Sequence, residues 1–147
     1  MIHVEFAVPI RASRASAWRL LKDKVETPQR FVAQVVACEV MERREDELVR
    51  RVTFDDGVAV TERVIFLPEK ELVYRFVDHP KFEGEIRNLL FQSGDSLWLS
   101  IYFQGRAREG VELDARDLDQ LREGFARAVL QAARQIEELE RAALERT

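Results

Sequence analysis

Residues 96–105 read SLWLSIYFQG, a run in which large apolar side chains recur at every second position. Successive side chains of a strand point to opposite faces. The face that we expect to be buried carries Leu97, Leu99, Ile101 and Phe103. After Gly110 the spacing becomes helical, and the apolar stripe consists of Leu118, Leu121, Phe125, Val129, Ala132, Ile136, Leu139 and Ala143. These two patterns predict a sheet that packs one face against a long amphipathic helix.

The same alternation marks six further strands upstream. Turn-forming residues such as Gly57, Pro68 and Gly94 separate most of these runs, and links this short favour antiparallel neighbours. Pro9 lacks a backbone donor and is expected to end the first strand. Together with 96–105, the expected strands are 2–8, 35–44, 47–55, 58–67, 71–79 and 84–92.

Two short helices are expected between the first strand and 35–44. Ser13 can cap the first of them, and Thr27 followed by Pro28 can begin the second. The last helix is expected to begin near Asp117, which forms a variant of a capping box with Gln120. Its roughly 28 residues extend about 42 Å at ~1.5 Å per residue, which is longer than a typical strand.

Composition and element order together predict one domain over residues 1–147. The chain is 46% hydrophobic and 34% charged, and a chain of this length buries roughly 68–70% of its unfolded surface. We therefore expect an α+β helix-grip fold, a seven-stranded curved antiparallel sheet wrapped around the long C-terminal helix and enclosing an apolar ligand cavity. The weaker alternative is that the last helix forms a coiled coil with another chain.

Charge and residue content exclude several classes of function. The net charge of -4 argues against nucleic acid and membrane surfaces as partners. The pair Arg50-Arg51 stands close to acidic residues, and we interpret such clusters as solvated strand ends and turns. Cys38 is the only cysteine, and the two histidines, His3 and His79, stand far apart, so no metal site and no cofactor are expected. Residues 1–6 show no basic stretch followed by an apolar run, and no segment approaches 18 uninterrupted apolar residues, so we expect a cytoplasmic protein.

Strand parity places two polar residues among apolar ones. On 58–67 the inward set is Val58, Val60, Glu62, Val64 and Phe66, and on 84–92 it includes Asn88. A buried carboxylate costs several kcal/mol unless it is paired, hydrogen-bonded or hydrated, and otherwise its pKa rises. Glu62 and Asn88 are therefore candidates for the polar points of a ligand site. Alternatively, Glu62 lies at a bulge or on the surface, and the Asn88 amide satisfies a loop carbonyl.

The opposite face of the sheet is more apolar than a monomer usually exposes. It carries Ile65, Val73, Leu89, Phe91, Trp98 and Tyr102. Either this outer face is covered, as in a homodimer, or the assigned parity is partly wrong.

Several segments resemble the AtaL-like group of the START and polyketide-cyclase superfamily. They are Val60-Thr61-Glu62-Arg63-Val64-Ile65, Ile86-Arg87-Asn88-Leu89-Leu90 and 97–103 leading into Arg108-Glu109-Gly110. The resemblance covers essentially the whole chain and departs from the group at Gly105-Arg106-Ala107. It implies a deep cavity between sheet and helix, in a superfamily that binds lipids, sterols, hormones and polyketides and includes some cyclases and dehydratases.

We therefore expect the protein to bind a small hydrophobic ligand, polyketide-, lipid- or aromatic-like, as a carrier or sensor. The expected ligand-binding residues are Glu62, Tyr74, Phe76, Asn88, Leu99, Ile101, Phe103, Phe125 and Val129. One alternative is a cyclase or dehydratase in which Glu62 is the general acid or base, helped by Asn88 or Tyr74. A second alternative is an assembly protein with a filled core.

Overall fold

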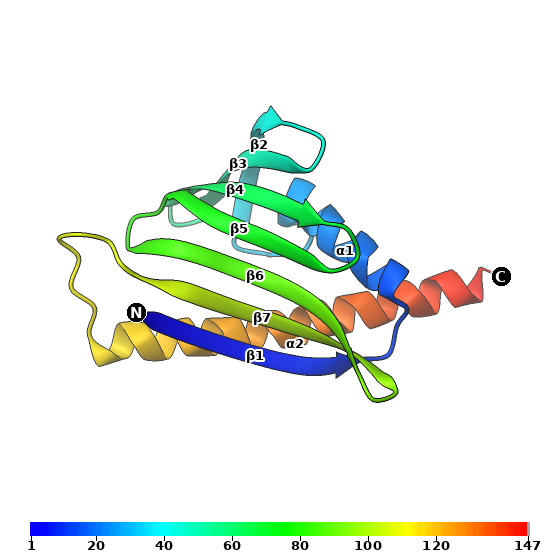
Figure 1. Ribbon diagram of the computed structural model, residues 1–147. Helices are drawn as coiled ribbons and strands as arrows, with labels where there is room; N and C mark the ends of the chain where they lie inside the picture. Colours follow the sequence, from blue (N-terminus) through cyan, green and yellow to red (C-terminus); the bar gives the residue numbers. More distant parts are fainter. Residues whose placement is uncertain (147) are drawn as a thin grey trace.

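The computed structural model describes residues 1–146 and has the predicted order of elements (Figure 1). Its strands are β1 (Ile2–Ile10), β2 (Val35–Arg43), β3 (Glu47–Phe54), β4 (Ala59–Leu67), β5 (Glu71–Asp78), β6 (Phe82–Ser93) and β7 (Ser96–Ala107). Its helices are α1 (Arg14–Glu26), a single 3-10 turn (Pro28–Arg30) and α2 (Ala115–Glu145).

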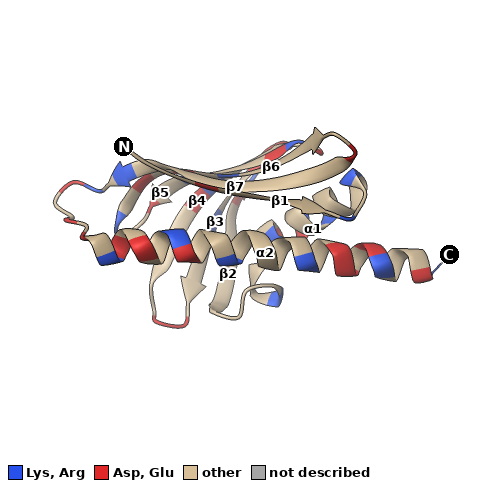
Figure 2. Cartoon of the chain, turned by 90° about the horizontal axis from the view of Figure 1, so that it is seen from below, with Lys and Arg blue, Asp and Glu red and all other residues tan. Residues whose placement is uncertain are grey.

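The seven strands form one antiparallel sheet in the order β1-β7-β6-β5-β4-β3-β2. Six strands follow one another as hairpins, and β1 joins the sheet beside the last of them. The sheet curves around α2, which contacts β1 and β7 on the concave side (Figure 2). Bulges in β2 and between β4 and β5 add local bend. The helix-grip architecture predicted from the sequence is thus confirmed.

Two predictions about element ends hold only in part. The Ser13 hydroxyl accepts a hydrogen bond from the amide of Ser16 and caps α1, as expected. Thr27 was expected to cap the second helix, but its hydroxyl donates to the carbonyl of Asp23, 2.9 Å away. Thr27 therefore closes α1, and Pro28 begins the 3-10 turn without a side-chain cap.

Two other boundary predictions are wrong. Pro9 lies inside β1, opposite Trp98, because β1 is an edge strand on which proline is tolerated. The N-cap of α2 is Asp114, which forms a reciprocal capping box with Asp117. The helix therefore begins about one turn earlier than expected and has 31 residues.

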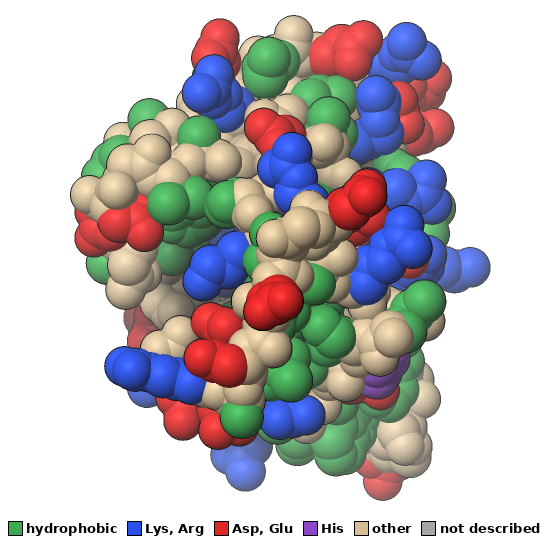
Figure 3. Space-filling view, turned by 90° about the vertical axis from the view of Figure 1, so that its left-hand side faces the viewer, with side chains coloured by type: hydrophobic (Ala, Val, Ile, Leu, Met, Phe, Trp, Pro, Cys, Tyr) green, Lys and Arg blue, Asp and Glu red, His purple; other side chains and the backbone are tan. Residues whose placement is uncertain are grey.

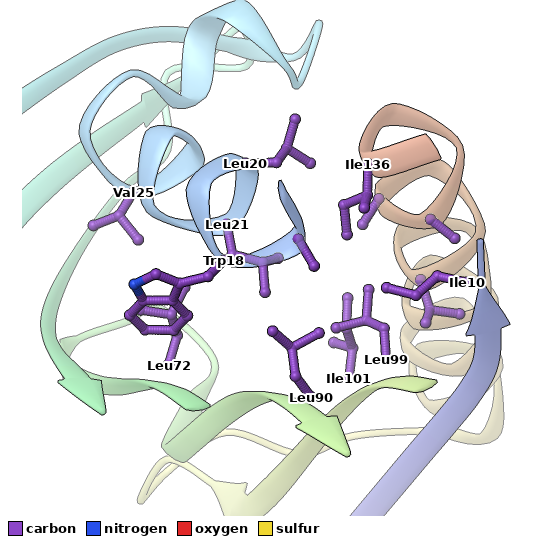
Figure 4. Packing of buried hydrophobic residues seen from close by; sticks show 14 of the residues in the cluster. Ile10, Trp18, Leu20, Leu21, Val25, Leu72, Leu90, Leu99, Ile101 and Ile136 are labelled. Carbon is purple, nitrogen blue, oxygen red and sulfur yellow. The ribbon is translucent and has the colours of Figure 1, made fainter. Parts of the chain in front are cut away.

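Helix α1 fills one end of the space between the sheet and α2 (Figure 4). Trp18 and Leu21 of α1 pack in one apolar cluster with Leu99 of β7 and Ile136 of α2. Leu99 and Ile136 are completely buried there. The β3–β4 turn and the β5–β6 loop lie at the opposite end of the molecule from α1 (Figure 1).

Burial agrees with the predicted parity on the strands that matter for the site. Glu62 and Asn88 are 6% and 9% exposed and lie among buried apolar residues. Val58 is the exception, with 37% of its surface exposed, because it belongs to the β3–β4 turn and precedes β4. Gly84 and Gly105 face each other across β6 and β7, where any Cβ would collide with the opposite backbone.

Ion pairs flank the apolar residues on the outer face of the sheet. Arg63 pairs with Glu47 at 2.8 Å, and Arg87 pairs with Glu71 at 2.7 Å. Val73 is buried on this face, and the other five apolar residues expected there are half-buried. A homodimer through this face stays a prediction.

Candidate functional site

Five adjacent strands each contribute one polar side chain to the concave face. They are Cys38 on β2, Arg50 on β3, Glu62 on β4, Tyr74 on β5 and Asn88 on β6. Arg50 stands directly opposite Glu62, and the others follow diagonally, because Glu62 is opposite Phe76 and Tyr74 is opposite Ile86. Neighbours on one sheet face are close enough for long side chains to interact. We call these five residues the polar row.

Arg50 is the centre of the polar row. Its Nη2 donates to Oε1 of Glu62 at 3.2 Å, and its Nη1 donates to the carbonyl of Val25 at 2.8 Å and that of Lys24 at 3.2 Å. The guanidinium also lies 5.1 Å from the centre of the Tyr74 ring, in cation–π geometry. It thus satisfies two carbonyls of the last turn of α1 and pairs with the only carboxylate of the row.

The interpretation of Arg50 as a solvated residue is wrong, since it is only 8% exposed. Its neighbour Arg51 is exposed, as expected. Local charge balance cannot distinguish the two, because consecutive residues of a strand face opposite sides. Strand parity could have found Arg50, which alternates with the apolar Leu48 and Val52.

Burial shifts the ionisation of the groups around Arg50. It raises the pKa of the Glu62 carboxyl, and the nearby Arg50 charge partly opposes that rise. Burial also raises the pKa of Tyr74 to about 12 and that of the Cys38 thiol above its usual value. The pKa of Lys24 falls to about 8, first because burial disfavours its charge and second because Arg50 repels it.

Much of the hydrogen-bonding capacity of the row is unused. Among residues 1–146, nothing hydrogen-bonds to Oε2 of Glu62, the Tyr74 hydroxyl or the Asn88 amide. The buried Nε of Arg50 likewise makes no hydrogen bond to the described residues. The expected alternative, in which Asn88 satisfies a loop carbonyl, therefore does not occur there. Glu62 does lie beside a bulge and still faces inward.

Aromatic rings continue the site from the row toward α2. The rings of Phe76 and Phe103 are 6.1 Å apart, and Phe103 stacks on Phe125 of α2 at 6.2 Å. On the other side, Phe76 stacks on His79 at 4.6 Å. The Nδ1 atom of His79 accepts from two backbone amides, so its Nε2 carries the proton when the ring is neutral. His79 is thus half-buried and not a free surface histidine.

A cleft of about 460 Å³ lies at this end of the molecule. Figure 3 faces the same end, where the surface is hollowed to the left of centre and hydrophobic side chains lie beside charged ones. The segment after the 3-10 turn, the β3–β4 turn and the β5–β6 loop all line the cleft. Val60 lies on its wall, two residues before Glu62 and on the same face of β4. The polar row itself does not line the cleft, and Val60 is the lining residue nearest to Glu62 along β4.

The structure divides the predicted site residues into three groups. Glu62, Tyr74 and Asn88 belong to the polar row, and Phe76, Phe103 and Phe125 form the aromatic group. The remaining three belong to the apolar cluster with α1: Leu99, Ile101 and Val129. That these residues bind a ligand stays a prediction. Arg50 and Lys24 were not among the predicted site residues.

Residues 1–146 contain no cluster of three His, Cys, Asp or Glu side chains arranged to hold a metal ion. Over the same range, none of the helices is both long and apolar enough to span a membrane.

A curved antiparallel sheet around a long C-terminal helix, with a polar row on its concave face, defines a helix-grip domain of the START-like class. The family model of AtaL, described as acetylaranotin biosynthesis cluster protein L, matches residues 8–143. The chain therefore belongs to the AtaL family. No curated protein matches its sequence.

Solved structures with this fold include aromatase/cyclase and START superfamily proteins. The di-domain ARO/CYC StfQ from the steffimycin biosynthetic pathway has a TM-score of 0.78 and 14% identity, over 98% of this chain and 52% of its own. The chain thus spans about half the length of that protein. A START superfamily protein from Mycobacterium smegmatis has a TM-score of 0.64 and 15% identity over 96% of this chain and 98% of its own.

The Zhui aromatase/cyclase from a Streptomyces species is similar over 99% of this chain and 94% of its own, with a TM-score of 0.59 and 23% identity. At these identities the likeness shows the fold and not the activity.

Proposed function

We propose that the protein binds a small, mostly apolar molecule between the concave sheet face and α2, as a carrier or sensor. The observation that carries this proposal is the polar row: Nε of Arg50 is buried without a hydrogen bond to the described residues, and Glu62, Tyr74 and Asn88 keep unused hydrogen-bonding capacity on the same face. A buried polar group without a hydrogen bond costs about 1–3 kcal/mol. A ligand oxygen that accepts a hydrogen bond from Nε of Arg50 removes that cost.

The polar row and the aromatic group favour a ligand with two chemically different parts. Arg50, Tyr74 and Asn88 offer hydrogen-bond donors, and Glu62 offers an acceptor. The aromatic group offers flat apolar surfaces, which suit a polycyclic or polyketide-like skeleton. START and aromatase/cyclase proteins with the same fold support this choice of ligand class.

Catalysis by Glu62 is the second candidate function. Burial raises the pKa of Glu62, which suits a general acid or base. The ion pair with Arg50 acts against that role, because it stabilises the carboxylate and fixes one of its oxygens. We therefore place the carrier first and the cyclase or dehydratase second.

The test is uptake of Nile red, a neutral hydrophobic dye, followed by its displacement with aromatic polyketides, fatty acids and sterols. The carrier predicts displacement without turnover, and displacement that survives Glu62→Gln. The enzyme predicts a new product by mass spectrometry, lost in Glu62→Gln while binding is kept. The absence of dye uptake would refute both and favour the assembly protein with a filled core.

A matched pair of variants locates the dye. Phe125→Ala opens the aromatic group from the α2 side and should change dye affinity. Leu130→Ala alters an exposed side chain of the same helix, 52% accessible, and should not. Equal effects of the two variants would place the dye outside the concave face.

A further inference from the structure

Two cations, Arg50 and Lys24, belong to neighbouring parts of the structure, because Nη1 of Arg50 donates to the Lys24 carbonyl at 3.2 Å. Arg50 and Glu62 form the buried ion pair of the concave face. Lys24 lies on α1, four residues after Leu20 and three after Leu21, both of which are buried. Residues at these spacings share one helix face, so Lys24 also turns toward the interior and is half-buried.

Neither cation is fully compensated. The Lys24 ammonium has no carboxylate partner and no hydrogen bond within residues 1–146. The Arg50 Nε is buried without a hydrogen bond to the described residues, and its Nη2 shares only one oxygen of Glu62. Buried charges in proteins are normally paired, so the Arg50 guanidinium, with one buried donor unused, favours a further negative partner, and the half-buried Lys24 adds a second positive charge.

We infer that the ligand carries an acidic group, a carboxylate or an acidic enol or phenol oxygen, which binds between Arg50 and Lys24. This inference rests on the proposed function, since it names the polar end of the same ligand. The guanidinium supplies the donor geometry for an anionic oxygen, and the ammonium supplies a second positive charge. The apolar part of the ligand then extends over the aromatic group toward α2.

The experiment compares acids with neutral amides of the same shape. 2-Naphthoate and 2-naphthamide, and decanoate and decanamide, compete with Nile red for the full-length protein at pH 7. Hydrogen bonds to a charged group are roughly twice as strong as neutral ones, so each acid should bind about five- to tenfold more tightly than its amide. Lys24→Met should lower this preference several-fold and leave amide affinity unchanged.

Lys22→Met is the matched control, because Lys22 is exposed on the same helix. It should retain the full preference for the acids. Arg50→Gln should abolish the preference, and circular dichroism reports whether that variant is folded. Because Lys24→Met removes a side chain without a carboxylate partner, it tests the inference even if Arg50→Gln does not fold.

Two results overturn the inference. If acids and amides displace the dye equally, the acidic group is wrong while hydrophobic binding stands. If Lys24→Met and Lys22→Met lower the preference to the same extent, the effect is one of surface charge and not of the site. Failure of the protein to take up Nile red at all would instead refute the proposed function.

Discussion

Replacement of Arg50 by Met should be among the most destabilising changes in the sheet. The variant leaves the Glu62 carboxylate buried and unpaired, and it removes the two hydrogen bonds to the last turn of α1. Removing one partner of a buried ion pair costs about 3–5 kcal/mol. Glu62→Gln should cost only about 1–2 kcal/mol, because Arg50 keeps both α1 carbonyls and the face of Tyr74.

The double variant Arg50→Met/Glu62→Leu separates the contribution of the ion pair to stability from that of side-chain packing. It leaves no unpaired charge, and apolar replacement of a whole buried pair is often neutral or stabilising. We expect it to recover at least ~1 kcal/mol relative to Arg50→Met. Urea unfolding followed by circular dichroism at pH 7 measures all four proteins, provided that the slopes m agree.

The pH dependence of the single variant gives an independent check. Without Arg50, desolvation alone acts on Glu62 and raises its pKa further above the unfolded value of 4.5. The folded state then binds more protons than the unfolded state above that value, so the variant loses stability as the pH rises. The deficit of Arg50→Met should therefore be smaller at pH 5 than at pH 7. A deficit equal at both pH values, or a double variant no more stable than Arg50→Met, would refute this account.

Four further predictions concern the fold and its surroundings. Gly105→Ala should lower stability by at least ~2 kcal/mol by thermal denaturation, because its Cβ would meet the backbone of β6. Ile136→Ala should cost about 2–5 kcal/mol in urea unfolding, against less than ~0.5 for the exposed Leu130→Ala. Because burial lowers the pKa of Lys24 to about 8, its charge destabilises the folded parent protein at pH 7, and Lys24→Met should be more stable there. This difference in the free energy of unfolding should shrink as the pH rises to 10. The exposed Lys22→Met should show no such trend. Light scattering should give a dimeric mass if the outer face pairs, and a monomeric mass in dilute solution would contradict that.

Strand alternation and turn residues were sufficient to predict the architecture. Every strand lies within two residues of its predicted bounds, because most hairpin turns carry Gly, Pro or Asp at the ends of clear apolar runs. Two of the errors, unlike those at Pro9 and Thr27, occurred where nearby residues offer the same chemistry, at Arg50 and Arg51 and at Asp114 and Asp117. Asp114 and Asp117 are both good N-caps, and the sequence pattern favoured the wrong one.

The centre of the site was harder to predict because it depends on strand register. Glu62 was expected to be buried, but its partner could be named only once β3 and β4 were aligned residue by residue. That alignment places Arg50 opposite Glu62 and leaves Arg51 outside. The contact with the last turn of α1 requires tertiary structure as well, since 25 residues separate Arg50 from Val25. Strand parity predicts which side chains face inward, whereas strand register determines which of them are in contact.

The polar row is difficult to explain by stability alone. A concave face that served only to pack against α2 would carry apolar residues at these positions, because a buried ion pair rarely stabilises more than well-packed apolar side chains of similar volume. The buried Nε of Arg50 adds a further cost as long as it lacks a hydrogen bond. If Arg50→Met/Glu62→Leu matches the parent protein in stability and yet loses its preference for acids, the fold does not need the row and the ligand does. That combination of results would separate the structural role of Arg50 at the end of α1 from its role in binding.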